Sequence, residues 1–213
     1  MDIAKVIAGE LGVRVGQVEA TVKLIDEGCT IPFIARYRKE VTGSLNDEIL
    51  RDLYERLTYL RNLEERKETV IASIEEQGKL TDELKKQILE AMTLVAVEDL
   101  YRPYKQKRRT RATIAKEKGL EGLANIIYLQ MTDHAVESDA QAYVSEEKGV
   151  ASVEEAVAGA LDIIAENISD EAEYRTYIRD ITVKEGKLVT SAKDADAKSV
   201  YEMYYDFEEP IAK

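Results

Sequence analysis

Proline constrains this chain most by its scarcity, because only Pro32, Pro103 and Pro210 occur in 213 residues. A proline inside a helix removes a backbone hydrogen bond and kinks or breaks the helix. The stretches 33–102 and 104–209 therefore contain no residue that forbids continuous helix. Apolar residues recur along both stretches at intervals of three and four, the spacing of one helix face. The sequence predicts an all-α fold, a multi-helix assembly.

The longest helix is predicted over residues 45–77, a length of about 50 Å at 1.5 Å per residue. Ser44 followed by Asp47 resembles a capping box at its start, and Gly78 stands where a left-handed residue would end it. Glu64 and Lys67 interrupt the apolar stripe. The stripe consists of Leu50, Leu53, Leu57, Leu60, Ile71 and Ile74.

Shorter helices are predicted elsewhere by the same spacing. They cover residues 3–11, 15–27, 81–92, 94–101, 120–130 and 153–168. Residues 181–190 alternate like a strand around a Lys-Glu-Gly-Lys turn, so a hairpin is an alternative there. We favour a helix that ends at Gly186.

Composition argues against several classes of function. One cysteine, Cys29, and one histidine, His134, cannot build a zinc site, and we find no catalytic motif or nucleotide-binding glycine loop. We therefore expect no enzyme activity, no cofactor and no metal. Neither a signal peptide nor an apolar run of about 18 residues is visible, so we expect a cytoplasmic protein that does not bind membranes.

Charge is distributed unevenly along the chain. The formal net charge is -12, yet residues 101–118 carry eight basic side chains and one acidic one. Residues 133–180 carry 13 acidic side chains against three basic ones. From this contrast we predict two regions, a helical region with the long helix and a basic loop over 1–131 and an acidic helical region over 132–213.

The first candidate binding segment is residues 28–43. Pro32 suits the first turn of a short helix, and Phe33 and Ile34 could anchor that helix. Arg36, Arg38 and Lys39, with Tyr37 between them, could then contact phosphate groups or a partner. Alternatively, these cations stabilise the carboxyl end of the helix and pair with Glu40 or Glu48.

The second candidate segment is residues 97–112. Tyr101 and Tyr104 flank the proline that ends a helix, and the basic residues follow in a segment expected to be irregular. Clustered cations near aromatic rings are typical of contacts with phosphates and unpaired bases. The candidate binding residues here are Lys105, Lys107, Arg108, Arg109 and Arg111. The alternative is a loop whose cations pair internally with the acidic stretch after Asp133.

Several strings in the chain resemble the N-terminal region of the Tex family of bacterial transcription accessory proteins. The most specific are residues 30–43 and 100–120, supported by Tyr59-Leu-Arg, by Glu-Gln-Gly-Lys-Leu-Thr at 76–81 and by Tyr-Tyr-Asp-Phe-Glu-Glu-Pro at 204–210. The resemblance spans most of the chain and is loose over 131–199. Arg102 and Gln106 depart from the family pattern, which has an apolar residue and a second proline there.

The resemblance implies a largely helical region with a helix-turn-helix-like element. It also implies a longer parent protein with a nuclease-like domain that lacks a full catalytic set, helix-hairpin-helix motifs and an S1 domain. The aromatic cluster of Tyr201, Tyr204, Tyr205 and Phe207 near residue 213 agrees with an excised fragment. The remaining domains of that parent protein are then expected partners.

Two functional hypotheses follow. In the first, the chain is a non-catalytic helical scaffold of a transcription accessory protein that binds RNA or single-stranded DNA weakly and without sequence preference. In the second, it is a protein-interaction module that docks on the transcription machinery, with the basic loop paired internally. The two differ in whether the cations of the loop are exposed or bound to carboxylates.

Overall fold

The computed structural model describes residues 1–106 and 108–212, and most of them are helical. This confirms the all-α prediction. The chain divides into two compact units, one over residues 1–98 and the other from Asp99 onward. Within the described residues, no helix is long and apolar enough to cross a bilayer.

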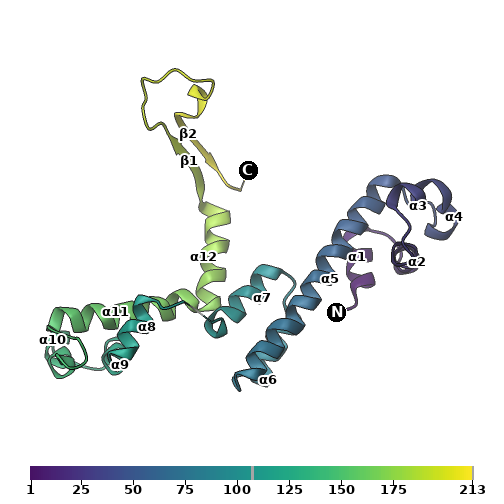
Figure 1. Ribbon diagram of the computed structural model, residues 1–213. Helices are drawn as coiled ribbons and strands as arrows, with labels where there is room; N and C mark the ends of the chain where they lie inside the picture. The colour runs from purple at the N-terminus through teal and green to yellow at the C-terminus, as the bar shows by residue number, and fades with distance from the viewer. Residues whose placement is uncertain (107, 213) are drawn as a thin grey trace. The chain divides into compact units, whose positions relative to one another are not determined.

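Six helices and most of a seventh form the first unit (Figure 1). They are α1 (Ile3–Leu11), α2 (Val15–Asp26), α3 (Ile31–Tyr37), α4 (Lys39–Thr42), α5 (Asp47–Glu76), α6 (Asp82–Glu90) and α7 (Leu94–Tyr101). The short helices α1, α2 and α3 pack around the first half of α5. A turn of three residues, 12–14, joins α1 to α2, which gives this end of the unit a helix-turn-helix connection.

The predicted long helix is α5, and its ends are defined by specific caps. Asn46 caps the start, because its side-chain oxygen accepts a hydrogen bond from the backbone N–H of Ile49. The prediction that Ser44 caps this helix is wrong: Ser44 lies outside it, with a positive φ of 65°. Gly78 follows the helix with a φ of 67°, as predicted for a left-handed terminal residue.

The buried face of α5 runs without a break through the position of Lys67. Its buried residues are Leu50, Leu53, Leu57, Leu60, Leu63, Lys67, Val70 and Ile74. Lys67 is fully buried because its ammonium group forms an ion pair with Glu64 at 2.8 Å and donates a hydrogen bond to the Leu89 carbonyl, also at 2.8 Å. The predicted stripe through Ile71 is therefore shifted by one residue, to Val70.

The second unit is built around α11 (Val153–Asp170), which packs on α8 (Arg111–Glu117), α9 (Glu121–Leu129) and α10 (Val136–Ala140) (Figure 1). The short 3₁₀ helix η1 (Arg102–Tyr104) precedes α8, and a second one, η2 (Gln141–Tyr143), follows α10. The core includes Ala115, Leu123, Ala140, Ala160 and Ile163. Residues on both sides of the division predicted at 131 and 132 thus share one core.

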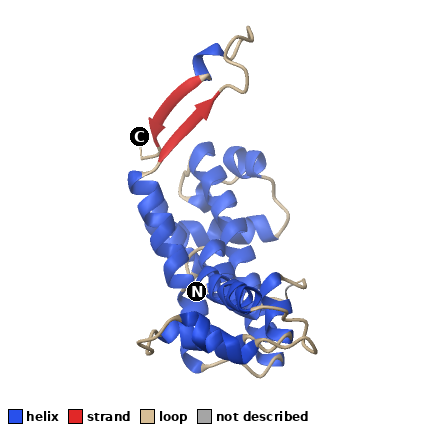
Figure 2. Ribbon diagram, turned by 90° about the vertical axis from the view of Figure 1, so that its left-hand side faces the viewer, coloured by secondary structure: helices blue, strands red, loops and turns tan. Residues whose placement is uncertain are grey.

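Helix α12 (Ala172–Glu185) leads from α11 into a two-stranded sheet (Figure 2). Strand β1 (Lys187–Ser191) pairs antiparallel with β2 (Asp206–Pro210), and η3 (Glu202–Tyr204) lies in their connection. The helix therefore ends before Gly186 as favoured above. The alternative hairpin over 181–190 is wrong, because β1 pairs with a segment more than ten residues further along the chain.

Asp99 ties α12 to the end of α7. Its carboxylate accepts hydrogen bonds of 2.7 Å from both Arg175 and Arg179, while none of the residues Ala172–Glu185 is itself buried. Burial opposes ionisation of Asp99, but the two guanidinium groups outweigh this effect and hold the pKa of the carboxyl below its usual value. A buried carboxylate thus anchors an otherwise exposed helix.

Candidate nucleic-acid interface

Helix α3 exposes the aromatic side chains of the first candidate segment. Pro32 lies in its first turn, where a missing N–H costs no helical hydrogen bond, and Ile34 is fully buried against the first unit. Phe33 is 38% exposed and Tyr37 is 61% exposed, with their ring centroids 5.3 Å apart. The predicted anchor is therefore Ile34 alone, and an aromatic pair faces the solvent.

One of the three cations of this segment, Arg38, contacts the aromatic pair. The guanidinium carbon of Arg38 lies 5.3 Å from the centre of the Phe33 ring, and Arg38 also donates a hydrogen bond to the Tyr37 carbonyl. Arg36 and Lys39 are exposed, and neither has an ion pair with any described residue. The expected pairing with Glu40 or Glu48 does not occur in the described part of the chain.

A contact between α2 and α4 holds this cationic end of the unit in place. The Gln17 side chain donates hydrogen bonds to the carbonyls of Thr42 and Gly43, at 3.0 and 3.1 Å. Arg14 in turn donates to the Gln17 side chain at 3.3 Å, which brings a fourth cation beside Gly43. Sequence reasoning missed Arg14, because no local pattern links it to residues 36–39.

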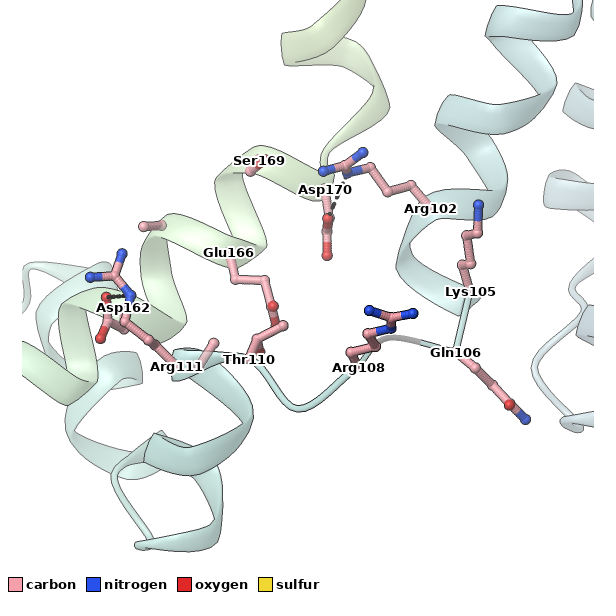
Figure 3. Close-up of a pocket in the computed structure, with 12 residues that line it drawn as sticks. Arg102, Lys105, Gln106, Arg108, Thr110, Arg111, Asp162, Glu166, Ser169 and Asp170 are labelled. Carbon is pink, nitrogen blue, oxygen red and sulfur yellow. Dashed lines mark hydrogen bonds and ion pairs between the residues drawn. The ribbon is translucent and has the colours of Figure 1, made fainter.

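The second candidate segment faces the acidic side of α11 (Figure 3). Arg102 binds Asp170 at 3.0 Å, and Arg111 lies 3.5 Å from Asp162. Carboxylates recur on this face of α11 every four residues, at positions 162, 166 and 170, one helical turn apart. The loop and the helix enclose a hollow of about 520 Å³.

The individual cations of this loop differ in their surroundings. Arg109 binds Glu117 at 2.7 Å, and Arg111 starts α8, a helix that was not predicted from the sequence. Lys105, Gln106 and Arg108 line the hollow (Figure 3). Arg108 has no ion pair with a described residue. The remaining candidate, Lys107, lies outside the described residues.

The two candidate segments therefore have different electrostatic environments. In the loop, carboxylates of the same unit neutralise Arg102, Arg109 and Arg111. At the α3–α4 end, Arg36 and Lys39 keep their charge uncompensated among the described residues, and the same segment exposes the rings of Phe33 and Tyr37. Cations next to aromatic faces can bind phosphates while the rings stack on unpaired bases.

Other chemistry-bearing side chains are dispersed. In residues 1–106 and 108–212, no group of three or more His, Cys, Asp or Glu is placed to hold a metal ion. His134 contacts Asp139 at 2.9 Å, and Cys29 is half-buried.

Two family models match the chain, one at each end. Residues 1–75 match the Tex-like protein N-terminal domain, and residues 132–213 match the Tex central region-like family. The second match begins at the boundary predicted from the charge contrast, whereas the two compact units divide after Glu98. The boundary at 131 and 132 stays a prediction.

Similar proteins agree with the family models. The chain is 52% identical to the uncharacterized protein YdcI of Bacillus subtilis over 97% of its length, and 44% identical to the transcriptional accessory protein Tex of Neisseria gonorrhoeae over 99%. It is 27% identical to the human S1 RNA-binding domain-containing protein 1 over 90%. It spans 29%, 28% and 19% of these relatives respectively.

The matches define a region of a Tex-like protein, a group that includes the transcriptional accessory protein Tex of Neisseria gonorrhoeae. The chain belongs to the Tex family, as its resemblance suggested, and it corresponds to less than a third of the length of the relatives that it matches.

Proposed function

We propose that this chain is a non-catalytic helical scaffold of a cytoplasmic transcription accessory protein, and that its α3–α4 end contacts single-stranded nucleic acid. One observation supports this site above the others: Arg36 and Lys39 are exposed and unpaired among the described residues, in the same short segment as the exposed rings of Phe33 and Tyr37. Arg38 is already oriented over Phe33, so one cation of the segment contacts the aromatic pair.

The expected binding is weak and depends on salt. Each phosphate neutralised on a single strand contributes about -0.7 to the log-log slope of affinity against salt, so three contacts give about -2. The net charge of -12 opposes long-range attraction of nucleic acid, so we expect a Kd no better than the roughly 10⁻⁴ to 10⁻⁶ M of non-specific binding.

The basic loop is expected to contribute less. A phosphate that approaches Arg102 or Arg111 must displace the carboxylate of Asp170 or Asp162. Exposed ion pairs are individually weak, at about 0–1 kcal/mol, so this displacement is feasible but reduces the gain. Arg108, which has no ion pair with a described residue, remains a candidate within the loop, and Lys107 remains a candidate outside the described residues.

Fluorescence anisotropy with a labelled RNA and a labelled single-stranded DNA, repeated over a salt series, tests this assignment. The double variant Arg36→Glu, Lys39→Glu should lose binding, and Tyr37→Ala should weaken it without changing the salt slope. Arg108→Glu, Arg109→Glu should have the smaller effect. Lys193→Glu, Lys198→Glu makes the same charge change at two exposed positions in the β1–β2 connection and serves as the control.

The outcomes separate the sites clearly. Equal losses in the α3–α4 variant and in the control would mean that only net charge matters, and the site would be rejected. Loss in the loop variant alone would move the contact to residues 102–111. Absence of binding by the unmutated chain at low salt would reject nucleic-acid binding by this region.

The internal pairing of the loop supports a second function, a protein-interaction module that docks on the transcription machinery. Three loop cations bind carboxylates, as this hypothesis expects. The docking function would be favoured if the full-length protein retained a transcription protein from the same cell. The variant Arg36→Glu, Lys39→Glu should then retain it equally well.

A further inference from the structure

A second hollow in the unit from Asp99 onward has a chemistry different from that of the loop. It lies between α9, α11 and α12 and has a volume of about 450 Å³, within the range of roughly 300–1,000 Å³ of ligand pockets. Tyr128 of α9 is 58% exposed and Tyr174 of α12 is 45% exposed. Ile164 of α11 adds apolar surface between them.

The polar groups of this hollow are acidic or neutral. Glu171 lies at the junction of α11 and α12, Glu173 lies in the first turn of α12, and Asn167 adds an amide. Among the described residues, neither glutamate has an ion pair. The nearby Arg175 does not neutralise them, since its guanidinium group binds Asp99 at 2.7 Å.

We propose that this hollow binds the lysine or arginine side chain of a basic peptide segment in a partner protein. Aromatic faces attract cations, and carboxylates beside them supply charged hydrogen-bond acceptors. No described residue that lines the hollow is basic, so an anionic ligand meets only repulsion from Glu171 and Glu173. The net charge of -10 over residues 133–180 favours a basic partner in the same way.

An adjoining hollow shows which glutamate is decisive. It shares Asn167 and Glu171 with the hollow between α9, α11 and α12, and it is also lined by Lys105, Lys116, Glu166 and Asp170. Charges of both signs therefore surround Glu171, whereas Glu173 lines only the hollow between α9, α11 and α12. Glu173, Tyr128 and Tyr174 are therefore expected to determine the affinity. This site is in a different unit from the α3–α4 surface, so either assignment can fail without the other.

NMR titration with a capped peptide that carries one cation tests the proposal. The probe is Gly-Ser-Arg-Ser-Gly, and the comparison peptide has glutamine in place of arginine. The arginine peptide should shift the side-chain amides of Asn125 and Asn167 and the backbone amide of Tyr174. The glutamine peptide should leave them unchanged, because it lacks the charge. Because the peptide carries only one positive charge, its non-specific attraction to this negatively charged protein is small.

Variants of the chain complete the test. Glu171→Gln, Glu173→Gln should weaken binding at least tenfold, while Glu146→Gln, Glu147→Gln removes the same charge outside the hollow and should not. Tyr174→Ala should weaken binding, and Tyr174→Phe should preserve it because the ring face remains. Thermal unfolding confirms that each variant is folded. Equal binding of the glutamine peptide, or equal losses in the two glutamate pairs, would overturn the proposal.

Discussion

Gly159 shows how closely the helices of the second unit approach one another. A Cβ atom at this position would overlap the Leu120 side chain and lie 3.3 Å from the Cβ of Ala115. The neighbouring core positions of α8 and α11 are alanines, which keeps the two helices close together. Glycine here is a packing requirement, and no turn or positive φ is involved.

Gly159→Ala should therefore destabilise the protein by about 1–3 kcal/mol, the usual cost of overpacking a core. Gly9→Ala is the matched control, because Gly9 is also inside a helix and has nothing within 4 Å of an added Cβ. It should stabilise the chain by up to about 1 kcal/mol through helix propensity. Urea unfolding measures both, and the same sign of change in the two variants would contradict the packing account.

Lys67 marks a limit of prediction at the level of single residues. The position of Lys67 in the sequence fits the buried stripe of α5. A lysine nevertheless predicts a solvent-exposed position as long as its partners are unknown. One partner, Glu64, is three residues away, whereas the other is the carbonyl of Leu89 on α6. Only the tertiary fold brings that carbonyl to the ammonium group, so the sequence indicated a break where the structure has continuity.

Helix α5 depends on its leucine stripe for the stability of the first unit. Leu57 is almost completely buried, so Leu57→Asp should destabilise the fold by several kcal/mol through an unpaired buried charge. Thr58→Asp places the same side chain on the exposed side of the same turn and should change stability by about 0.5 kcal/mol or less. Thermal unfolding compares them. An unchanged Tm for Leu57→Asp would mean that the stripe is not a core.

Helix α12 depends instead on one carboxylate. Because the pKa of Asp99 is lowered in the folded protein, its contribution is complete above the pKa of an unfolded aspartate, about 3.9, and is lost as pH falls through the lower folded value. Asp99→Asn should reduce the local stability of α12 by about 1–2 kcal/mol at neutral pH. The loss is no larger because both arginines are partly exposed to water, which screens their ion pairs with Asp99.

Hydrogen exchange of the α12 amides measures this effect, with about a tenfold or larger loss of protection expected in Asp99→Asn. Asp180→Asn, the same change at an exposed position of α12, is the control and should keep its protection. If unmutated α12 retains full stability at pH 3 and below, after correction for intrinsic exchange rates, Asp99 is not its anchor.

The elements that sequence could predict are those whose signal is local. Helix α5 follows from the leucine spacing, whereas α8 was missed because its buried face is Ala112 and Ala115 among basic residues. The β1–β2 pairing joins distant segments and has no turn signal. Sequence also found both basic segments and offered the acidic stretch after Asp133 as a partner of the loop. It could not show which cations pair, because Asp162 and Asp170 lie more than 50 residues beyond the loop that they neutralise.

At the scale of the whole chain, the connection between β1 and β2 is an exposed segment that is accessible to proteases. Lys193 and Lys198 lie in it, both exposed and outside any described helix or strand. Trypsin should cut there before it cuts within α5 or α11, since exposed loops are cleaved preferentially. Mass spectrometry of early fragments identifies the site, and Lys193→Gln, Lys198→Gln should delay it. A first cut inside α5 would contradict the description of the first unit.

The regular row of carboxylates on α11 has a consequence for ionic strength. The basic loop in effect carries its own counterions, held on a rigid helix at positions 162, 166 and 170. A nucleic acid that bound there would release condensed cations, but the vacated carboxylates would take up cations from solution in their place. Fewer ions would be set free for each phosphate bound, so the affinity of this loop would vary with salt less steeply than that of an equally charged loop on a neutral scaffold.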